Sequence, residues 1–256
     1  MKKVIINADD FGLSRSTNEG IVIAMTEGIV SSTTLMVNMP EARHAVELAN
    51  KYNIKNIGVH LNLTKGPTVL PRHEVPLLYL DDNKRFDVRK KKRFDFRKKP
   101  LTDEILMQIE QELEAQILKC YDFGIKPTHL DSHHHIHMLD GISNIVINLA
   151  KKYNLAVRTV NYSKYHDQVK MPVFVDCSFY DKRVSLKQLQ KILTKEHDGI
   201  FEIMTHPGYM SQELVDISIY NEKREQELAI LTSDEILTFI QENNIELVSF
   251  KDLVSR

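Results

Sequence analysis

Histidines are concentrated in one part of this chain. Of the eleven histidines in the 256 residues, five fall between residues 129 and 137. Imidazole is the commonest metal ligand in proteins and the usual proton carrier near neutral pH. An affinity tag would sit at a terminus, whereas this cluster is internal. The cluster therefore indicates a metal or catalytic site.

Ionisable side chains follow five of the short apolar runs in the sequence, at the point where each run ends. These residues are Asp9 and Asp10, His60, Asp131 and His133, Arg158, and His206. In β/α-barrel enzymes the active site is built at the carboxyl ends of the strands, from residues of many strands. One such residue could be structural, but five runs that each supply Asp, His or Arg predict a shared site.

An aspartate with two histidines is a common ligand set for a catalytic divalent metal, with one position left for water. Of the adjacent carboxylates Asp9 and Asp10, one would bind the cation and the other would hold a proton-transfer position. The spacing leaves open which does which. The alternative for this pair is a helix N-cap, and the alternative for His60 is a buried ring bonded to the backbone.

The histidine cluster offers more rings than one ion can bind. If a strand ends near Asp131, then His129, Asp131 and His133 point the same way. If a helix begins there, His133 and His137 come together at i, i+4 spacing. We favour His133 as the ligand and predict that His129, Asp131, His135 and His137 surround the ligands or contact substrate.

Two further residues suit roles in the chemistry. His206 precedes Pro207-Gly208, a turn that would hold the ring at the mouth of a barrel. A histidine facing the metal there would be a suitable general acid for a leaving amine. Arg158 could pair with a carboxylate and tune it, or it could neutralise an oxyanion.

Strand-length apolar runs alternate along the chain with helix-length amphipathic stretches. The predicted strands are Lys3–Ala8, Ser32–Val37, Ile57–Val59, Thr128–Asp131, Ala156–Thr159, Val173–Asp176, Ile200–Met204 and Glu246–Ser249. The predicted helices are Thr17–Glu27, Glu41–Tyr52, Thr102–Phe123, Ile142–Tyr153, Leu186–Thr194, Tyr220–Leu231 and Ser233–Glu242. Repeated β–α units predict the α/β class, as a TIM-like (β/α) barrel of seven or eight parallel strands in regular or distorted form. An open doubly wound sheet is the alternative.

Composition narrows the classes of function and location. With 34 Lys+Arg against 35 Asp+Glu, the net charge of -1 argues against nucleic acid and membrane surfaces as partners. No apolar run is long enough for a membrane span or a signal peptide, and two cysteines make no disulfide framework. We therefore expect a cytoplasmic protein, as a monomer or a homo-oligomer such as a dimer.

We predict one domain over residues 1–256, with an irregular insertion at about 64–100. Its residues 83–99 hold ten Lys/Arg and two Asp. The basic run is expected to be a solvated loop or a subunit contact; the alternative is a patch for an anionic partner.

Several motifs, taken in order along the chain, resemble the YdjC-like carbohydrate deacetylases, which include the bacterial chitooligosaccharide deacetylases. The motifs are Asn7-Ala8-Asp9-Asp10-Phe11-Gly12, Ser31-Ser32-Thr33-Thr34, Gly58-Val59-His60-Leu61, Thr128-His129-Leu130-Asp131-Ser132-His133-His134-His135 and Thr205-His206-Pro207. The similarity runs from residue 3 to about 250, and only the stretch from about 64 to 100 contains no motif of the family.

The resemblance implies a β/α barrel related to the NodB-type polysaccharide deacetylases and one divalent metal ion. It implies Asp10, His60 and His133 as metal ligands, Asp9 as the base and His206 as the acid. The implied reaction removes N-acetyl groups from chitobiose or longer chitooligosaccharides and releases acetate, so the partner is a small carbohydrate. The family implies Mg²⁺, whereas two imidazoles with one carboxylate suit Zn²⁺, Co²⁺ or Mn²⁺ on chemical grounds.

One feature departs from the NodB pattern, and two other functions stay open. In the NodB type both histidine ligands share one His-x-x-x-His motif, whereas His60 and His133 come from different strands, so substrate preferences do not transfer. A metal-dependent phosphoesterase or nuclease could use the same Asp/His set, with the basic stretch on phosphate. A non-catalytic sugar- or metal-binding protein would leave Asp9 and His206 without a task.

Overall fold

The residues predicted to form the site lie on, or directly after, strands of one parallel sheet. The structure is a computed structural model that describes residues 2–79 and 101–254. The strands are β1 (Lys2–Phe11), β2 (Ser32–Leu35), β3 (Ile57–Leu61), β4 (His129–Ser132), β5 (Ala156–Val157), β6 (Val175–Asp176), β7 (Phe201–Thr205) and β8 (Ile245–Leu247). Their order is β5-β4-β3-β2-β1-β7-β6, with β8 beside the start of β1. Because the pairings are parallel, the carboxyl ends of the strands gather at one edge.

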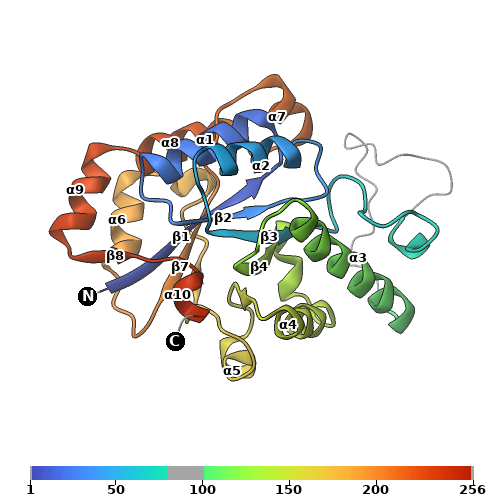
Figure 1. Cartoon of the computed structure of the whole chain (residues 1–256). Helices are drawn as coiled ribbons and strands as arrows, with labels where there is room; N and C mark the ends of the chain where they lie inside the picture. Colours follow the sequence, from blue (N-terminus) through green and yellow to red (C-terminus); the bar gives the residue numbers. More distant parts are fainter. Residues whose placement is uncertain (1, 80–100, 255–256) are drawn as a thin grey trace.

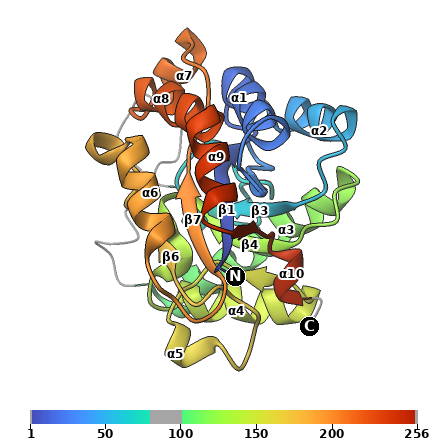
Figure 2. The same cartoon turned by 90° about the vertical axis from the view of Figure 1, so that its left-hand side faces the viewer.

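Helices surround the outside of this sheet (Figures 1 and 2). They are α1 (Arg15–Thr26), α2 (Ala42–Lys51), α3 (Asp103–Asp122), α4 (Ile142–Tyr153), α5 (Tyr162–Tyr165), α6 (Leu186–Thr194), α7 (Gln212–Ile217), α8 (Glu222–Leu231), α9 (Asp234–Glu242) and α10 (Lys251–Val254). Short 3₁₀ turns are η1 (Pro76–Leu78), η2 (His133–Met138) and η3 (Asp181–Arg183). Serine or threonine caps begin several helices, as at Thr102 before α3 and Ser233 before α9.

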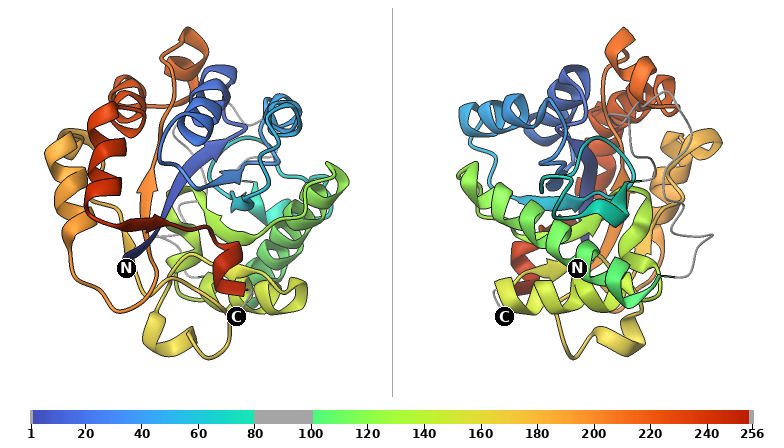
Figure 3. Two further views of the ribbon diagram at one scale, coloured as in Figure 1. Left: turned by 60° about the vertical axis from the view of Figure 1, so that its left-hand side comes forward. Right: turned by 90° about the vertical axis from the view of Figure 1, so that its right-hand side faces the viewer.

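The sheet is curled, with the helices around its outer side (Figure 3). The end strands in the pairing order are β5 and β6, and the chain between them connects the two. The Val157 N–H donates to the Lys170 carbonyl oxygen at 2.9 Å, and the Thr159 hydroxyl donates to the Pro172 carbonyl oxygen at 2.7 Å. Between β5 and β6, hydrogen bonds to a loop thus replace the strand-to-strand hydrogen bonds that close a regular barrel. The α/β prediction is confirmed in its distorted form, and the doubly wound alternative is wrong because helices cover the outer face of a curled sheet.

Strand β1 shows how the sheet separates an apolar exterior from a polar interior. Val4, Ile6 and Ala8 are buried in the main core against the helices. The alternate residue Ile5 faces inward, in a small apolar cluster with Ala156, Ile200, Val248 and Phe250. Further along the same inner face, Asn7 and Asp9 are buried polar residues. The inside of the curl is therefore apolar toward the amino ends of the strands and polar toward their carboxyl ends.

The predicted elements match the structure closely. Every predicted strand and helix is present, with ends that differ by a few residues. Helices α5, α7 and α10 have no counterpart in the prediction; they have four to six residues, too few for a periodic pattern to show. None of the helices in residues 2–79 and 101–254 is long and apolar enough to cross a membrane.

The start of the predicted insertion is held against α3. Glu112 accepts the Val69 and Leu70 N–H groups at 2.8 and 3.0 Å, and Gln108 accepts the Leu77 N–H at 2.8 Å. Buried polar side chains of one helix thereby satisfy the backbone of this loop. The predictions for the basic run 83–99 lie outside the described residues.

Candidate active site and metal centre

The end of β1 brings two adjacent carboxylates to one site. Asp10 has a φ of +73°, in the left-handed region that aspartate tolerates better than most residues. An extended strand would place Asp9 and Asp10 on opposite faces, but this turn lets both reach the interior. Asp9 and Asp10 are both buried. The N-cap of α1 is Ser14, so the alternative reading of this pair as a helix cap is wrong.

Asp10, His60 and His133 converge from β1, β3 and the turn after β4. The Asp10 Oδ1 atom lies 3.4 Å from His60 Nε2 and 2.9 Å from His133 Nδ1. Within the described residues, one donor atom from each of the three falls within 4.8 Å of the others, and all three residues are buried. This is a three-donor arrangement of the size that a metal ion requires.

Asp131 sets the orientation of the His60 ring. His60 Nδ1 donates to Asp131 Oδ1 at 2.8 Å, and the Thr34 hydroxyl donates to Asp131 Oδ2 at 3.1 Å. This contact turns Nε2 of His60 toward Asp10, as carboxylates commonly do for metal-binding histidines. Burial opposes a charged ring, yet Asp131 and Asp10 raise the pKa of His60 to about 10. The pocket therefore favours positive charge, which fits a cation.

The donor chemistry also fits a metal ion. Burial lowers the pKa of His133, and the neutral ring is the form that binds metals. Its Nε2 atom is buried without a hydrogen-bond partner among the described residues. A second set, Asp9, His60 and Asp131, is equally close. There, however, Arg158 Nη2 lies 2.6 Å from Asp9 and 3.0 Å from Asp131, so a cation already stands between these carboxylates.

Arg158 binds Asp9 through both of its terminal nitrogens. Nη1 donates to Asp9 Oδ2 at 2.7 Å and Nη2 donates to Asp9 Oδ1 at 2.6 Å. Nε donates to Glu202 at 2.8 Å, so each guanidinium nitrogen already serves a carboxylate. Burial alone would raise the pKa of Asp9, but Arg158 holds it well below its usual range. Of the two roles predicted for Arg158, the geometry favours carboxylate pairing over an oxyanion contact.

His206 lies across from Asp9 at the end of β7. Its Nε2 is 3.9 Å from Asp9 Oδ2, and its Nδ1 is buried without a partner in the described structure. Burial lowers the pKa of His206 to about 3, so the ring is neutral at neutral pH. The following turn packs tightly on α1, because a Cβ on Gly20 would lie 2.5 Å from Gly208 Cα. This close packing fixes the segment that carries the ring.

Helix α8 supplies two site residues that the sequence analysis missed. The buried Arg224 donates from Nη2 to Asp10 Oδ2 at 2.6 Å. Glu227, one turn later, accepts the His206 N–H at 2.5 Å and the Tyr220 hydroxyl. The available signal is their spacing, since Arg224 and Glu227 at i, i+3 share one face of α8 and Tyr220 lies just before that helix. The helix sequence is rich in charged residues, so from sequence alone these two side chains look like part of its solvent-exposed surface.

The remaining histidines of the cluster separate from one another. His129 lies in the apolar layer of the interior and stacks on Phe250 with ring centroids 3.5 Å apart. His137 contacts the Ser132 hydroxyl, and His135 is half-buried with its ring centroid 6.0 Å from that of His137. Positive φ angles at His134 and His135 break η2, so the i, i+4 helix alternative is not realised. Of the cluster, the candidate metal centre contains His133, with Asp131 behind His60.

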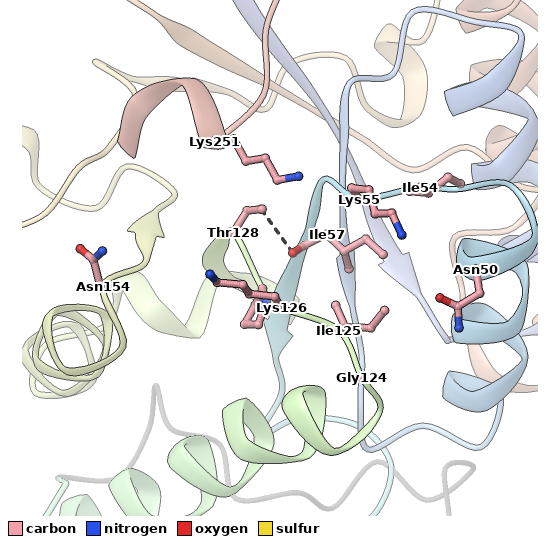
Figure 4. A pocket seen from close by; sticks show the side chains of 11 residues that line it. Asn50, Ile54, Lys55, Ile57, Gly124, Ile125, Lys126, Thr128, Asn154 and Lys251 are labelled. Carbon is pink, nitrogen blue, oxygen red and sulfur yellow. Dashed lines mark hydrogen bonds between the residues drawn. The ribbon is translucent and has the colours of Figure 1, made fainter. Parts of the chain in front are cut away.

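A separate hollow of about 560 Å³ lies at the other end of the strands (Figure 4). Its lining includes Ile57, which begins β3, Thr128, which precedes β4, and Lys251 of α10. These positions are at the amino ends of parallel strands, the end that serves stability in barrels. None of the predicted site residues lines it. The concentration of buried charge, and not the size of this hollow, locates the candidate site.

Removing any one of the three donors should abolish metal binding. We expect Asp10→Ala, His60→Ala and His133→Ala to lose stoichiometric metal in elemental analysis while circular dichroism shows a retained fold. His166→Ala is the control, because this exposed histidine stacks on Tyr162 outside the site, so the variant should keep its metal. Full metal content in all three variants would refute the assignment.

Glu227 should make stability depend on pH. Burial raises the pKa of this carboxyl to about 8, above the usual value near 4.5. Such a group stabilises the fold fully below its unfolded pKa and loses that contribution as the pH rises through its folded pKa. The free energy of unfolding should therefore fall as the pH rises from about 4.5, the unfolded pKa, to about 8, the folded pKa.

In Glu227→Gln that fall should be shallower, because an amide does not titrate. Glu225→Gln, at an exposed position of the same helix, should behave like wild type. Urea titrations at several pH values provide the measurement. Parallel pH curves for wild type and Glu227→Gln would contradict the assignment.

Comparison with known proteins shows the family of this chain. Residues 3–242 match the family model described as YdjC-like protein. A carbohydrate deacetylase of Clostridium beijerinckii is 36% identical over 98% of this chain and 100% of its own length. One of Thermoanaerobacter pseudethanolicus is 38% identical over 99% and 100%. A crystal structure of an Enterococcus faecalis protein named for cleavage of cellobiose phosphate superposes with a TM-score of 0.86 at 31% identity, covering 98% of both chains. The chain therefore belongs to the YdjC-like family, and its similarity to these relatives supports deacetylase activity on carbohydrates.

Proposed function

We propose that this protein is a metal-dependent hydrolase that removes N-acetyl groups from oligosaccharides containing N-acetylglucosamine, such as chitobiose, and releases acetate. The observation that carries the proposal is the adjacency of Asp9 and Asp10. Asp10 completes a metal-donor set with His60 and His133, while Asp9 lies 3.9 Å from His206. The similarity to carbohydrate deacetylases supports this choice of bond and substrate class.

Asp10, His60 and His133 would hold the metal ion. Such an ion polarises the acetyl carbonyl as a Lewis acid and makes a bound water more acidic. Two nitrogen donors with one carboxylate favour Zn²⁺, Co²⁺ or Mn²⁺ over Mg²⁺, which prefers oxygen ligands. Arg224 binds the second oxygen of Asp10, which fixes the carboxylate with Oδ1 toward the histidines.

Asp9 and His206 form the proton-handling pair. Arg158 keeps Asp9 ionised, so the carboxylate can accept a proton from the attacking water. A carboxylate with so low a pKa holds a proton weakly and passes it on. The neutral ring of His206 lies within 3.9 Å and can take it.

Protonated in this way, His206 delivers the proton to the amide nitrogen, which cannot leave as an anion. The carbon–nitrogen bond breaks, the new carbon–oxygen bond becomes part of acetate, and the free amine departs. In this role His206 is the general acid that the sequence analysis predicted. The low pKa of His206 favours a relay from water.

The direct test compares two bond classes on the metal-loaded protein. We expect acetate release from N,N′-diacetylchitobiose, measured by coupled assay or NMR. We expect no phosphate release from simple phosphomonoesters. Phosphate without acetate would overturn the proposal in favour of a phosphoesterase.

Asp9→Asn should keep the metal and lose most turnover. The amide cannot accept the water proton, and loss of a general base costs on the order of 10²–10⁴-fold in rate. The measurement is kcat on chitobiose alongside metal content. Asp176→Asn is the control, because Asp176 is another buried strand-end aspartate, paired with Lys195 outside the site. Near wild-type activity of Asp9→Asn would move the base role, with Asp131 next in line.

His206→Ala should slow amides more than esters. A nitrophenyl acetate leaves as a stabilised phenolate that needs no proton, whereas an amine must be protonated as it departs. We therefore expect a loss on chitobiose of about 10²–10⁴-fold and a much smaller loss on the ester. Equal losses on both substrates would show that His206 serves binding or the metal. The acid would then be sought among His129, His135 and His137.

A further inference from the structure

An exposed tyrosine ring stands beside the proton-handling pair. Tyr180 follows β6 and precedes η3, and 38% of it is exposed. Its ring lies edge-on to the ring of His206, with centroids 5.5 Å apart. Strand β6 ends at the same edge of the sheet as the other strands, so this ring belongs to the mouth of the candidate site.

Tyr180 is held in place from behind by Tyr220. The two rings are stacked, with centroids 4.2 Å apart and planes 16° from parallel. Tyr220 is itself buried and fixed, since its hydroxyl contacts Glu227 and its carbonyl oxygen accepts Arg224 Nε at 2.9 Å. Because Tyr220 covers one face of Tyr180, a ligand can reach the ring only from the opposite face or from the edge.

We propose that this free face of Tyr180 is the platform on which a pyranose ring of the substrate packs during deacetylation. A pyranose presents a face of C–H groups, and the face of an aromatic ring carries the negative charge density that attracts them. The chain has no tryptophan, so a tyrosine or a phenylalanine would have to supply such a surface. This inference rests on the proposed function, because it takes the substrate to be a sugar.

The position next to His206 suits that role. The leaving amine is attached directly to the pyranose, so the sugar that receives the proton must lie near the histidine. A ring already fixed by stacking loses little conformational entropy when a ligand packs on it. Tyr180 would therefore contribute to substrate affinity and orientation, without taking part in bond breaking.

The chain offers a matched control in Tyr162. This residue of α5 is also 38% exposed, and it stacks on His166 with centroids 4.9 Å apart and planes 17° from parallel. Its stacking partner His166 lines a hollow with Asn154 and Leu155, just before the amino end of β5. Tyr162 thus matches Tyr180 in exposure and in stacking, but only Tyr180 lies beside His206.

The first experiment compares Tyr180→Leu, Tyr180→Phe and Tyr162→Leu on the metal-loaded protein. For chitobiose we expect Tyr180→Leu to raise KM roughly three- to tenfold, the range for loss of one aromatic contact. Tyr180→Phe keeps the ring and Tyr162→Leu spares it, so both should match wild type. Hydrolysis of nitrophenyl acetate, which has no pyranose, should change less than twofold. Equal losses on both substrates, a defect in Tyr180→Phe, or an unchanged KM in Tyr180→Leu would each overturn the platform.

A second measurement separates this inference from the proposed function. In the Asp9→Asn background, saturation-transfer NMR should show transfer from the protein to the ring protons of chitobiose. Adding Tyr180→Leu should reduce that transfer, and adding Tyr162→Leu should not. Transfer that depends on Tyr180, together with no acetate release by the metal-loaded wild-type protein, would refute the deacetylase proposal and keep the platform. Acetate release by the wild-type protein, with a transfer that Tyr180→Leu leaves unchanged, would support the deacetylase proposal and refute the platform.

Discussion

The buried guanidinium of Arg158 is the interaction on which the rest of the site depends. It is fully buried inside the curled sheet and contacts Asp9 of β1, Asp131 of β4 and Glu202 of β7. Three carboxyl groups withdrawn from water would otherwise repel one another, and each would tend to take up a proton. Arg158 keeps Asp9 ionised, whereas burial raises the pKa of Glu202 to about 7 despite the same contact. One cation thus links three strands from within and sets which carboxyl groups carry charge.

A second guanidinium, that of Arg224, gives the two adjacent aspartates different surroundings. Arg224 binds one oxygen of Asp10 and leaves the other facing His60 and His133, whereas Arg158 binds both oxygens of Asp9. Asp9, Asp10 and Asp131 bring three negative charges to the pocket, and the two arginines bring two positive ones. Asp131 and Asp10 raise the pKa of His60, so these carboxylates favour a further positive charge beside them. A metal ion at Asp10, His60 and His133 would supply that positive charge. Between Asp9 and Asp131 the positive charge is already supplied by the Arg158 guanidinium.

Much of this site could be predicted because a strand end is a local feature of sequence. An apolar run followed by Asp9, His60 or His206 shows both where a strand stops and which side chain it delivers. The ordering within the histidine cluster could not be predicted, since it depends on left-handed backbone at His134 and His135. Arg224 and Glu227 were missed for a different reason. Their partners Asp10 and His206 are distant along the chain, and only the packing of α8 over the His206–Gly208 turn reveals them.

The space that the buried Arg158 side chain needs also explains why the barrel closes through loops. Strand β5 has two paired residues, and Arg158 follows it directly. The Arg158 N–H donates to Leu130 of β4 at 2.9 Å, while the preceding Val157 N–H donates to Lys170 on the opposite side at 2.9 Å. The backbone that carries the arginine is therefore fixed from both neighbours, although no ladder joins β5 to β6 in the described residues. A long side chain such as arginine needs room inside the curl, where a regular barrel is filled by layers of packed apolar side chains. Irregular closure at this seam leaves that room, and the charged interior on which the chemistry depends occupies it.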